Sequence, residues 1–334
     1  MSDTSMRILV ADIGGTNARF ALADPMAKMP LLRDSIRDYR VADFSGCTEA
    51  ARHYLDDADA HPVRGMFAVA GPIVDGSVRF TNSDWVIDSK AVAAGIGLDT
   101  LQLINDFAAM SLSLPLLADG DQRLLGTPQR KRFNAVAAQT FAVLGAGTGL
   151  GVGALLLRDG RAMALQTEGG HMSFAPRGAE QIGILQRLAA RFGHVSNERL
   201  LSGSGLVNIY AALADMAGAN AEPLVPEDVT KRAEAHADTL CVRAVEIFCE
   251  VLGAVAGDLV LGFGAWDGVY LSGGLTPLLL PWLERGDLRE RFEDKGRYAD
   301  KLRAVPVSAV LDTDAGLLGA AAGAVIAAGG TLVD

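Results

Sequence analysis

Two glycine-rich segments of the chain have the composition of anion-binding turns. The first spans residues 12–17 (Asp-Ile-Gly-Gly-Thr-Asn), the second spans residues 145–151 (Gly-Ala-Gly-Thr-Gly-Leu-Gly), and each follows a run of apolar residues. Glycines in such a turn let several backbone N–H groups point at one anionic oxygen. Neither segment contains a lysine. If they bind phosphate, they must therefore use backbone N–H groups, the hydroxyl groups of Thr16 and Thr148, and a metal ion.

The second segment does not match the common nucleotide-binding motifs. It contains no aligned G-x-G-x-x-G, and the apolar run after it is typical of a strand, which argues against a dinucleotide fingerprint. No Gly-Lys-Ser/Thr follows it, which argues against a Walker P-loop. In the first segment, Asp12 at the end of a strand can hold a magnesium ion through water. The alternative is an ordinary hairpin whose aspartate faces solvent.

A carboxylate at another predicted strand end is a candidate general base. Asn105 and Asp106 stand where the apolar run 101–104 gives way to a helical pattern. In open α/β sheets such strand ends line the ligand crevice. An aspartate there can accept a proton from a substrate hydroxyl group. Capping of the helix by Asp106 explains its position equally well.

Glu168 and His171 flank two glycines and are candidates for binding a polyol. On a helix their spacing would suggest a metal site, but Gly169 and Gly170 disfavour a helix. On a loop they offer one acceptor and one switchable donor or acceptor to neighbouring hydroxyl groups. A purely structural loop is the alternative. Glu198 is either a second carboxylate for the polyol or a capping residue of the next element.

Length and composition exclude several classes of protein. The chain has 334 residues, 38 of them glycine, whereas average usage of about 7% predicts only about 23. A hydrophobic fraction of 50% and a charged fraction of 21% argue against disorder. A net charge of −10 argues against a non-specific binder of nucleic acid or anionic membrane. Three cysteines without a CxxC predict a reducing cytoplasm and no cysteine-rich zinc site.

Residues 315–333 form a 19-residue stretch without charge, which is nearly long enough to span a membrane. The stretch consists mostly of alanine and glycine and lies between Asp314 and Asp334. We therefore expect a tightly packed buried helix there rather than a membrane span.

The predicted strands and turns that carry these residues form a pattern that occurs twice in the chain. The pattern of apolar run, glycine turn and second apolar run around Asp12 recurs at Gly145, 133 residues later. This recurrence predicts an internal duplication, with two related α/β domains that each open with a β-meander. The length is also that of about two domains. A polar loop that contains Asn82 precedes Trp85; we expect the tryptophan in the core, and the asparagine can face a ligand.

The remaining pattern predicts further elements. Residues 117–134 are polar and predict a surface loop, whereas residues 227–263 have the periodicity of a long helix. Val74 and Val78 flank Asp75-Gly76, a hairpin signal. Further helices are predicted at 48–55, 89–94, 107–114, 178–191 and 205–216, and further strands at 65–70 and 269–271.

Together these motifs resemble the bacterial glucokinase family, within the superfamily of sugar kinases, Hsp70 and actin. The resemblance runs through nearly the whole chain, and the order of the motifs makes it specific. It rests on the segments 12–19, 81–82, 104–107, 145–151, 168–171, 198–199, 201–203 and 316–319. Residues 73–78 and 216–230 depart from the family pattern.

The resemblance implies a duplicated, ribonuclease H-like and actin-like ATPase fold, with sugar and ATP in a cleft between two α/β domains. It implies a smaller domain of residues 1–110 with 312–334, and a larger domain of residues 111–311. It also implies phosphorylation of glucose at the 6-hydroxyl group, magnesium as a cofactor, a role in glycolysis and a homodimer. The family's catalytic aspartate falls on Asp106.

The other implied site residues form two groups. The sugar ligands are Asn82, Asn105, Asp106, Glu168, His171 and Glu198. The ATP-binding residues are Asp12, which also holds magnesium through water, together with Gly14, Gly15, Thr16, Asn17, Gly147, Thr148, Gly149, Gly273 and Gly274.

Three other functions compete with this interpretation. A kinase for mannose, fructose or an amino sugar differs by a single hydroxyl partner. A non-catalytic sugar-sensing repressor would carry an N-terminal DNA-binding domain, whereas the first predicted strand starts at about residue 7. An actin-like or chaperone-like ATPase does not account for Glu168 and His171. The related repressor/kinase family usually carries a cysteine-rich zinc motif, and no cysteine lies between Cys47 and Cys241.

Overall fold

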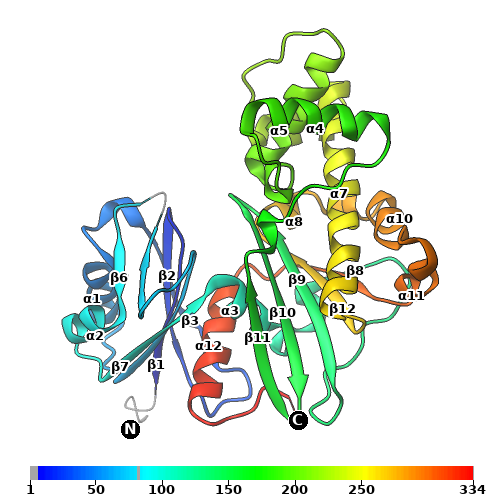
Figure 1. Cartoon of the computed structure of the whole chain (residues 1–334). Coiled ribbons are helices and arrows are strands. Elements are labelled where there is room, and N and C mark those ends of the chain that lie inside the picture. The colour runs from blue at the N-terminus through cyan, green and yellow to red at the C-terminus, as the bar shows by residue number, and fades with distance from the viewer. Residues whose placement is uncertain (1–6, 81–82, 334) are drawn as a thin grey trace.

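The computed structural model describes residues 7–80 and 83–333, and two large β-sheets dominate it (Figure 1). The first sheet has the order β3-β2-β1-β4-β7. Its strands are β1 (Ile8–Ile13), β2 (Asn17–Ala23), β3 (Leu31–Arg40), β4 (Arg64–Val69) and β7 (Thr100–Asn105). Strands β1, β2 and β3 form an antiparallel meander, and β4 and β7 run parallel to β1.

The second sheet repeats this topology and adds one edge strand. Its order is β11-β10-β9-β12-β13-β8, with β9 to β11 as the meander and β12 and β13 parallel to β9. The strands are β8 (Gln122–Leu125), β9 (Gln139–Ala146), β10 (Leu150–Arg158), β11 (Arg161–Thr167), β12 (Gly268–Ser272) and β13 (Val307–Val310). The predicted duplication, in which each half opens with a meander, is confirmed.

Short and helical elements complete the fold. A small hairpin pairs β5 (Ser77–Arg79) with β6 (Val86–Asp88). The helices are α1 (Cys47–Asp57), α2 (Ser89–Ile96), α3 (Asp106–Ser113), α4 (Gly178–Phe192), α5 (Gly203–Met216), α6 (Pro226–Glu234), α7 (Thr239–Phe263), α8 (Leu275–Leu278), α9 (Leu280–Leu283), α10 (Asp287–Glu293), α11 (Ala299–Arg303) and α12 (Ala315–Ala327). Short 3-10 turns lie at Val41–Asp43, Leu114–Leu116, Asp119–Asp121, Gly169–His171, Asn197–Arg199 and Gly296–Tyr298.

Helix α12 returns from the second sheet to the first. It packs against β1, β2, β3 and β4 and against α3, so α3 and α12 lie between the two sheets (Figure 1). Most of its residues are buried, and Gly319 meets the backbone of Ala109 on α3. The prediction of a packed buried helix at 315–333 is confirmed for residues 315–327. Among the described residues no helix is long and apolar enough to cross a membrane.

The long helix predicted at 227–263 is in fact two helices. Helix α6 ends at Glu234, and the chain turns at His236, which has a left-handed φ of 49°. Asp238 then caps α7 by accepting hydrogen bonds from the N–H groups of Leu240 and Cys241. A side-chain cap of this kind favours a new helix start over continuation of the old one.

The prediction of a surface loop at 117–134 is wrong for residues 122–125. These residues form β8 at the edge of the second sheet. Only Leu125 of this strand is fully buried. The pattern predicted a meander in each half but did not locate its third strand, which is β3 in the first sheet and β11 in the second. Strands β3 and β8 carry many polar residues, and β11 has no fully buried residue, so their conformation depends on the ladder to a neighbouring strand.

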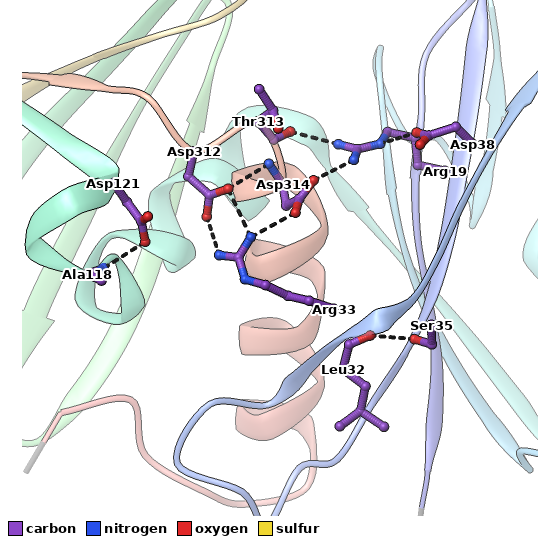
Figure 2. Close-up of polar contacts among 10 residues, drawn as sticks. All are labelled: Arg19, Leu32, Arg33, Ser35, Asp38, Ala118, Asp121, Asp312, Thr313 and Asp314. Atoms are coloured by element: carbon purple, nitrogen blue, oxygen red, sulfur yellow. Dashed lines mark hydrogen bonds and ion pairs between the residues drawn. The ribbon is translucent and has the colours of Figure 1, made fainter.

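A network of ion pairs joins the first sheet to the segment that leads into α12 (Figure 2). Arg19 on β2 donates to Asp314 at 2.5 Å and to the carbonyl oxygen of Thr313 at 2.7 Å. Arg33 on β3 donates to Asp312 at 2.6 Å and to Asp314 at 2.8 Å. Although burial opposes it, the hydrogen bond from Arg33 holds the pKa of Asp312 below its usual value. The network therefore fixes the start of α12 on the first sheet.

Candidate active site

A cavity of about 300 Å³ lies between the two sheets. Its wall combines the end of β1, the first turns of α3, the β12–α8 turn and the segment between β13 and α12. The lining residues are Asp12, Asp106, Phe107, Met110, Ser272, Gly273, Gly274, Pro277, Val310, Leu311, Asp312, Thr313 and Gly316. The structure thus brings together four of the predicted site residues, Asp12, Asp106, Gly273 and Gly274.

Asp106 stands at the junction of β7 and α3, at the edge of this cavity. The side-chain oxygen of Asn105 accepts hydrogen bonds from the N–H groups of Phe107 at 3.0 Å and Ala108 at 3.1 Å. Asn105 is therefore the helix cap, the role that the sequence left open for Asp106. Asp106 accepts one hydrogen bond, from the N–H group of Phe107 at 2.9 Å.

The surroundings of Asp106 tune its acidity. Burial is the main cause that raises the pKa of Asp106, and the N–H group of Phe107 opposes it. The negative charges of Asp12 and Glu168 add to the rise, and the pKa that results is about 6. A carboxylate with a pKa just below neutrality is ionised at pH 7 and still basic enough to accept a proton in a transition state.

Asp12 also lines the cavity, at the end of β1. Burial raises its pKa, and the charge of Arg19 opposes the shift. A Cβ atom at Gly316 would lie 2.3 Å from Oδ2 of Asp12, so only glycine fits at this point of α12. Within residues 7–80 and 83–333 no hydrogen bond to the Asp12 carboxylate is found.

Each glycine turn is closed by one backbone hydrogen bond, which spans three residues in the first turn and two residues in the second. The N–H group of Gly14 donates to the carbonyl oxygen of Asn17, and that of Gly147 donates to the carbonyl oxygen of Gly149, both at 2.9 Å. Each turn leaves two N–H groups without a partner in the described part of the chain, and these N–H groups can meet an anion. They belong to Gly15, Thr16, Thr148 and Gly149.

The turn after β12 lies beside the second glycine turn. Gly273 has a φ of 86°, and a Cβ atom there would lie 2.4 Å from the carbonyl oxygen of Ala146. The N–H group of Gly274 lies 3.9 Å from the position of a Cβ atom at Gly147. Ser272, buried at the end of β12, has a hydroxyl oxygen with no hydrogen-bond partner among the described residues.

Glu168, His171 and Glu198 lie on two segments that are bound to each other. The N–H group of Asn197 donates to the carbonyl oxygen of Met172 at 2.8 Å. Glu168 and His171 are exposed, and the segment Gly169–His171 forms a single 3-10 turn where we expected a loop. Glu168, which precedes this turn, is near enough to raise the pKa of Asp106.

Glu198 contacts the second glycine turn directly. Its Oε2 atom accepts a hydrogen bond from the N–H group of Leu150 at 2.9 Å. Ser202, rather than Glu198, caps the following helix α5 by accepting from the N–H group of Gly205. The capping role that the sequence left open for Glu198 is therefore wrong, and its other oxygen has no hydrogen-bond partner in the described part of the chain.

One predicted site residue lies outside the described residues, and several residues of the site were not predicted from the sequence. Asn82 lies outside the described residues, and Trp85 is buried, as predicted. The sequence pattern gave no role to Ser272 or Phe107, although each adjoins a predicted site residue. Asp312 and Thr313 also line the cavity, and only the chain path from β13 to α12 brings them there.

Comparison with known proteins gives consistent matches. A family model described as Glucokinase matches residues 9–326. A glucokinase from Stenotrophomonas maltophilia (strain K279a) is 52% identical over 322 residues, which are 96% of each chain. The crystal structure of a glucokinase from an Antarctic psychrotroph has a TM-score of 0.84 at 35% identity, covering 95% of this chain and 98% of that one.

A more distant structure shares the fold. A ROK family glucokinase from Streptomyces griseus, solved in complex with glucose and AMPPNP, has a TM-score of 0.62 at 18% identity. The match covers 94% of this chain and 98% of that one.

Proposed function

The chain belongs to the glucokinase family and is an ATP-dependent sugar kinase, and we propose that Asp106 is the general base that activates the 6-hydroxyl group of glucose. The resemblance and the two-part, actin-like fold predicted from the sequence are both confirmed. The observation that carries the proposal is the Asp106 carboxylate, with a pKa of about 6, in the cavity between the two sheets.

In the proposed reaction the hydroxyl oxygen of glucose attacks the γ-phosphorus of ATP. An O–P bond forms, the bond to the β,γ-bridging oxygen breaks, and ADP leaves with the electron pair. Asp106 accepts the hydroxyl proton. The N–H groups of Gly15, Thr16, Thr148 and Gly149 stabilise the charge on the transferred group. Because phosphoryl transfer depends mainly on positioning and electrostatics, the absence of lysine from both turns is no obstacle.

The residues of the cavity fit a magnesium ion bound mainly by phosphate. No group of three or more candidate ligand side chains is found in the described part of the chain. The Asp12 carboxylate, half-buried and without a hydrogen bond there, would hold the ion through water. One or two carboxylates plus phosphate oxygens and water is the ligand set that Mg²⁺ prefers in kinases. When bound, the ion would neutralise charge on the β- and γ-phosphates.

The sugar ligands in this proposal are Asn105, Glu168, His171 and Glu198, with Asn82. Asn105 uses its oxygen to cap α3, which leaves its amide N–H groups for a sugar oxygen. Glu198 uses one oxygen on Leu150, which leaves the other for a hydroxyl group. The contact to Leu150 also couples the sugar ligand to the phosphate-binding turn.

We expect the pH dependence of kcat/KM to follow the ionisation of the Asp106 carboxylate. The base acts only when ionised, so the rate should rise with pH and reach half of its plateau near pH 6, where the pKa of Asp106 lies. The measurement is a coupled assay of ADP release at subsaturating glucose between pH 5 and 8.5. A profile that is flat from pH 5 to 7 would contradict the raised pKa of the base.

Replacement of Glu168 by Ala should chiefly weaken glucose binding. A hydrogen bond to a carboxylate is worth about 1.5–3 kcal/mol, so the dissociation constant for glucose should rise about 10- to 100-fold. Calorimetric titration with glucose measures this, with Glu234→Ala as control because Glu234 is exposed at the end of α6. An unchanged dissociation constant would remove Glu168 from the sugar site.

A panel of sugars tests the substrate. ADP release should be stimulated more strongly by glucose than by mannose, fructose or an amino sugar at equal concentration. Faster turnover with one of those sugars would identify this chain as the corresponding kinase. No stimulation by any sugar would contradict the proposed function.

The proposal includes the domain division, assembly and location implied by the resemblance. Packing of α12 on the first sheet supports a smaller domain of residues 1–110 with 312–334 and a larger one of residues 111–311. Three buried free cysteines, Cys47, Cys241 and Cys249, are consistent with the reducing cytoplasm. Light scattering on the purified chain tests the proposed homodimer.

A further inference from the structure

The aromatic ring of Phe107 occupies a gap between two glycines on the second sheet. Gly145 on β9 pairs directly with Gly151 on β10. A Cβ atom at Gly151 would lie 1.9 Å from two carbons of the Phe107 ring, and one at Gly145 would lie 2.7 Å from its Cζ atom. Side chains on a cross-strand pair normally stand about 5 Å apart and fill this space. The paired glycines therefore form a socket for the ring, which we call the glycine socket.

The rest of α3 follows the same face of the sheet. A Cβ atom at Gly153, two residues beyond Gly151, would lie 3.0 Å from the hydroxyl oxygen of Ser111 and 3.2 Å from the carbonyl oxygen of Phe107. Any larger residue at 151 or 153 would push the helix away from β10. The glycines thus bring the first turn of α3 close to the hairpin that carries the turn at 147–149.

The backbone of Phe107 holds the proposed base. Its N–H group donates to the carboxylate of Asp106 at 2.9 Å and to the side chain of Asn105 at 3.0 Å. One residue therefore contacts the base with its backbone and the phosphate-side hairpin with its ring. This arrangement fixes the position of the carboxylate relative to the N–H groups of the second glycine turn.

We propose that Phe107, whose ring lies in the glycine socket, is a positioning residue. It holds the Asp106 carboxylate at a fixed position relative to the second glycine turn. The inference rests on the proposed function, since it assigns Phe107 a role in phosphoryl transfer through Asp106. Ordinary core packing is the competing explanation. Phe107 does pack against the core cluster that contains Leu112 and Phe141. Two features point beyond packing alone: Phe107 lines the reaction cavity, and its ring lies against a cross-strand pair of glycines.

Replacement of Phe107 by Leu tests this role. Leu keeps an apolar side chain but cannot fill the socket, so α3 can shift by a fraction of an ångström. Because misplacement by about 1 Å can cost 100-fold in rate, we expect kcat to fall at least 10-fold while KM for glucose changes less than 3-fold. The half-maximum of the pH profile should also move below pH 6, because a looser first turn admits water to Asp106.

Leu112→Ala is the matched control. Leu112 is buried on the same helix but does not line the cavity, so its loss should lower the melting temperature with less than a 2-fold change in kcat of the folded protein. If Phe107→Leu behaves like this control, or keeps kcat within 2-fold and its pH profile unchanged, the positioning role is refuted. If the wild-type chain shows no glucose-dependent ADP release, the proposed function fails instead.

A double-mutant cycle covers the case in which Phe107→Leu folds poorly. Gly151→Ala should lower the melting temperature and kcat in the wild-type background, because its methyl group collides with the ring. In the Phe107→Ala background the same substitution has space, so its effect on melting temperature should be at least halved. Equal effects in the two backgrounds would mean that the ring does not occupy the socket.

Discussion

Asp106→Asn should lower kcat at least 100-fold and up to about 10,000-fold, whereas glucose binding remains measurable. The substitution keeps the shape of the side chain and an oxygen for the N–H group of Phe107, but the amide cannot accept the hydroxyl proton. General bases contribute about 10²- to 10⁴-fold, and Asp106→Ala should fall in the same range. Coupled ADP release measures kcat, and calorimetry measures the dissociation constant of glucose.

The same substitution should stabilise the folded chain at neutral pH. The pKa of Asp106 is raised from 3.8 to about 6, so above pH 6 the folded state holds an ionised carboxylate that the cavity disfavours. The stability lost in this way grows as pH rises from about 4 to 6 and is constant above that. Removing the charge should therefore stabilise the folded state by about 3 kcal/mol at pH 7.5 and by almost nothing at pH 4.

Asp56→Asn provides the control, because Asp56 is exposed on α1 and does not line the cavity. It should change neither kcat nor the free energy of unfolding by a measurable amount. Retention of half of the wild-type kcat by Asp106→Asn would exclude Asp106 as the base. Lower stability of that variant at pH 7.5 would contradict the raised pKa.

Gly319→Ala should be the most destabilising of the single-methyl additions considered for this chain. A Cβ atom at Gly319 on α12 would lie 1.9 Å from the carbonyl oxygen of Ala109 and 2.3 Å from its carbonyl carbon. Backbone atoms of a buried helix cannot turn aside as a flexible side chain can, so α12 and α3 must separate. Overpacking of a core costs about 1–3 kcal/mol and sometimes more.

Gly319→Ala should also lower the catalytic rate. Ala109 follows Asp106 by three residues on α3, so a displacement of this helix also moves the proposed base. We expect urea unfolding of Gly319→Ala to show a lower midpoint, and the folded protein to show a kcat reduced at least 10-fold.

Gly323→Ala is a control on the same helix, one turn further on. The nearest atoms to a Cβ there belong to the side chain of Met66 at 3.6 Å, which is ordinary contact distance. Alanine also favours a helix over glycine by about 1 kcal/mol, so this variant should be as stable as the wild type or more stable. Equal unfolding midpoints for the two variants would show that α12 and α3 do not approach as closely as the structure indicates.

Many elements were predictable because their signals are local. The two glycine turns, the strands before them and the junction at Asn105–Asp106 are encoded in neighbouring residues. Amphipathic helices such as α4 have a periodicity that a short window reveals. The bounds of the edge strands β3, β8 and β11 were not predictable, because these segments are polar or exposed and become strands only by pairing with a neighbour.

The candidate site was likewise predictable only in part. Residue type and spacing were enough to select Asp12, Asp106 and Glu168 as chemically able residues. Whether Asp106 or Asn105 caps α3 could not be decided from two adjacent polar residues at a strand end. The hydrogen bonds of Asn105 decided it.

The sequence by itself determined the family, the duplicated fold and the set of groups that can meet phosphate and sugar, because these follow from motifs of a few adjacent residues. Only the tertiary structure decided how those groups act on one another. The pKa of Asp106 depends on burial and on charges from distant parts of the chain, and its placement depends on glycines of the other sheet. Electrostatics and packing are functions of distance in space, and a linear pattern does not contain those distances.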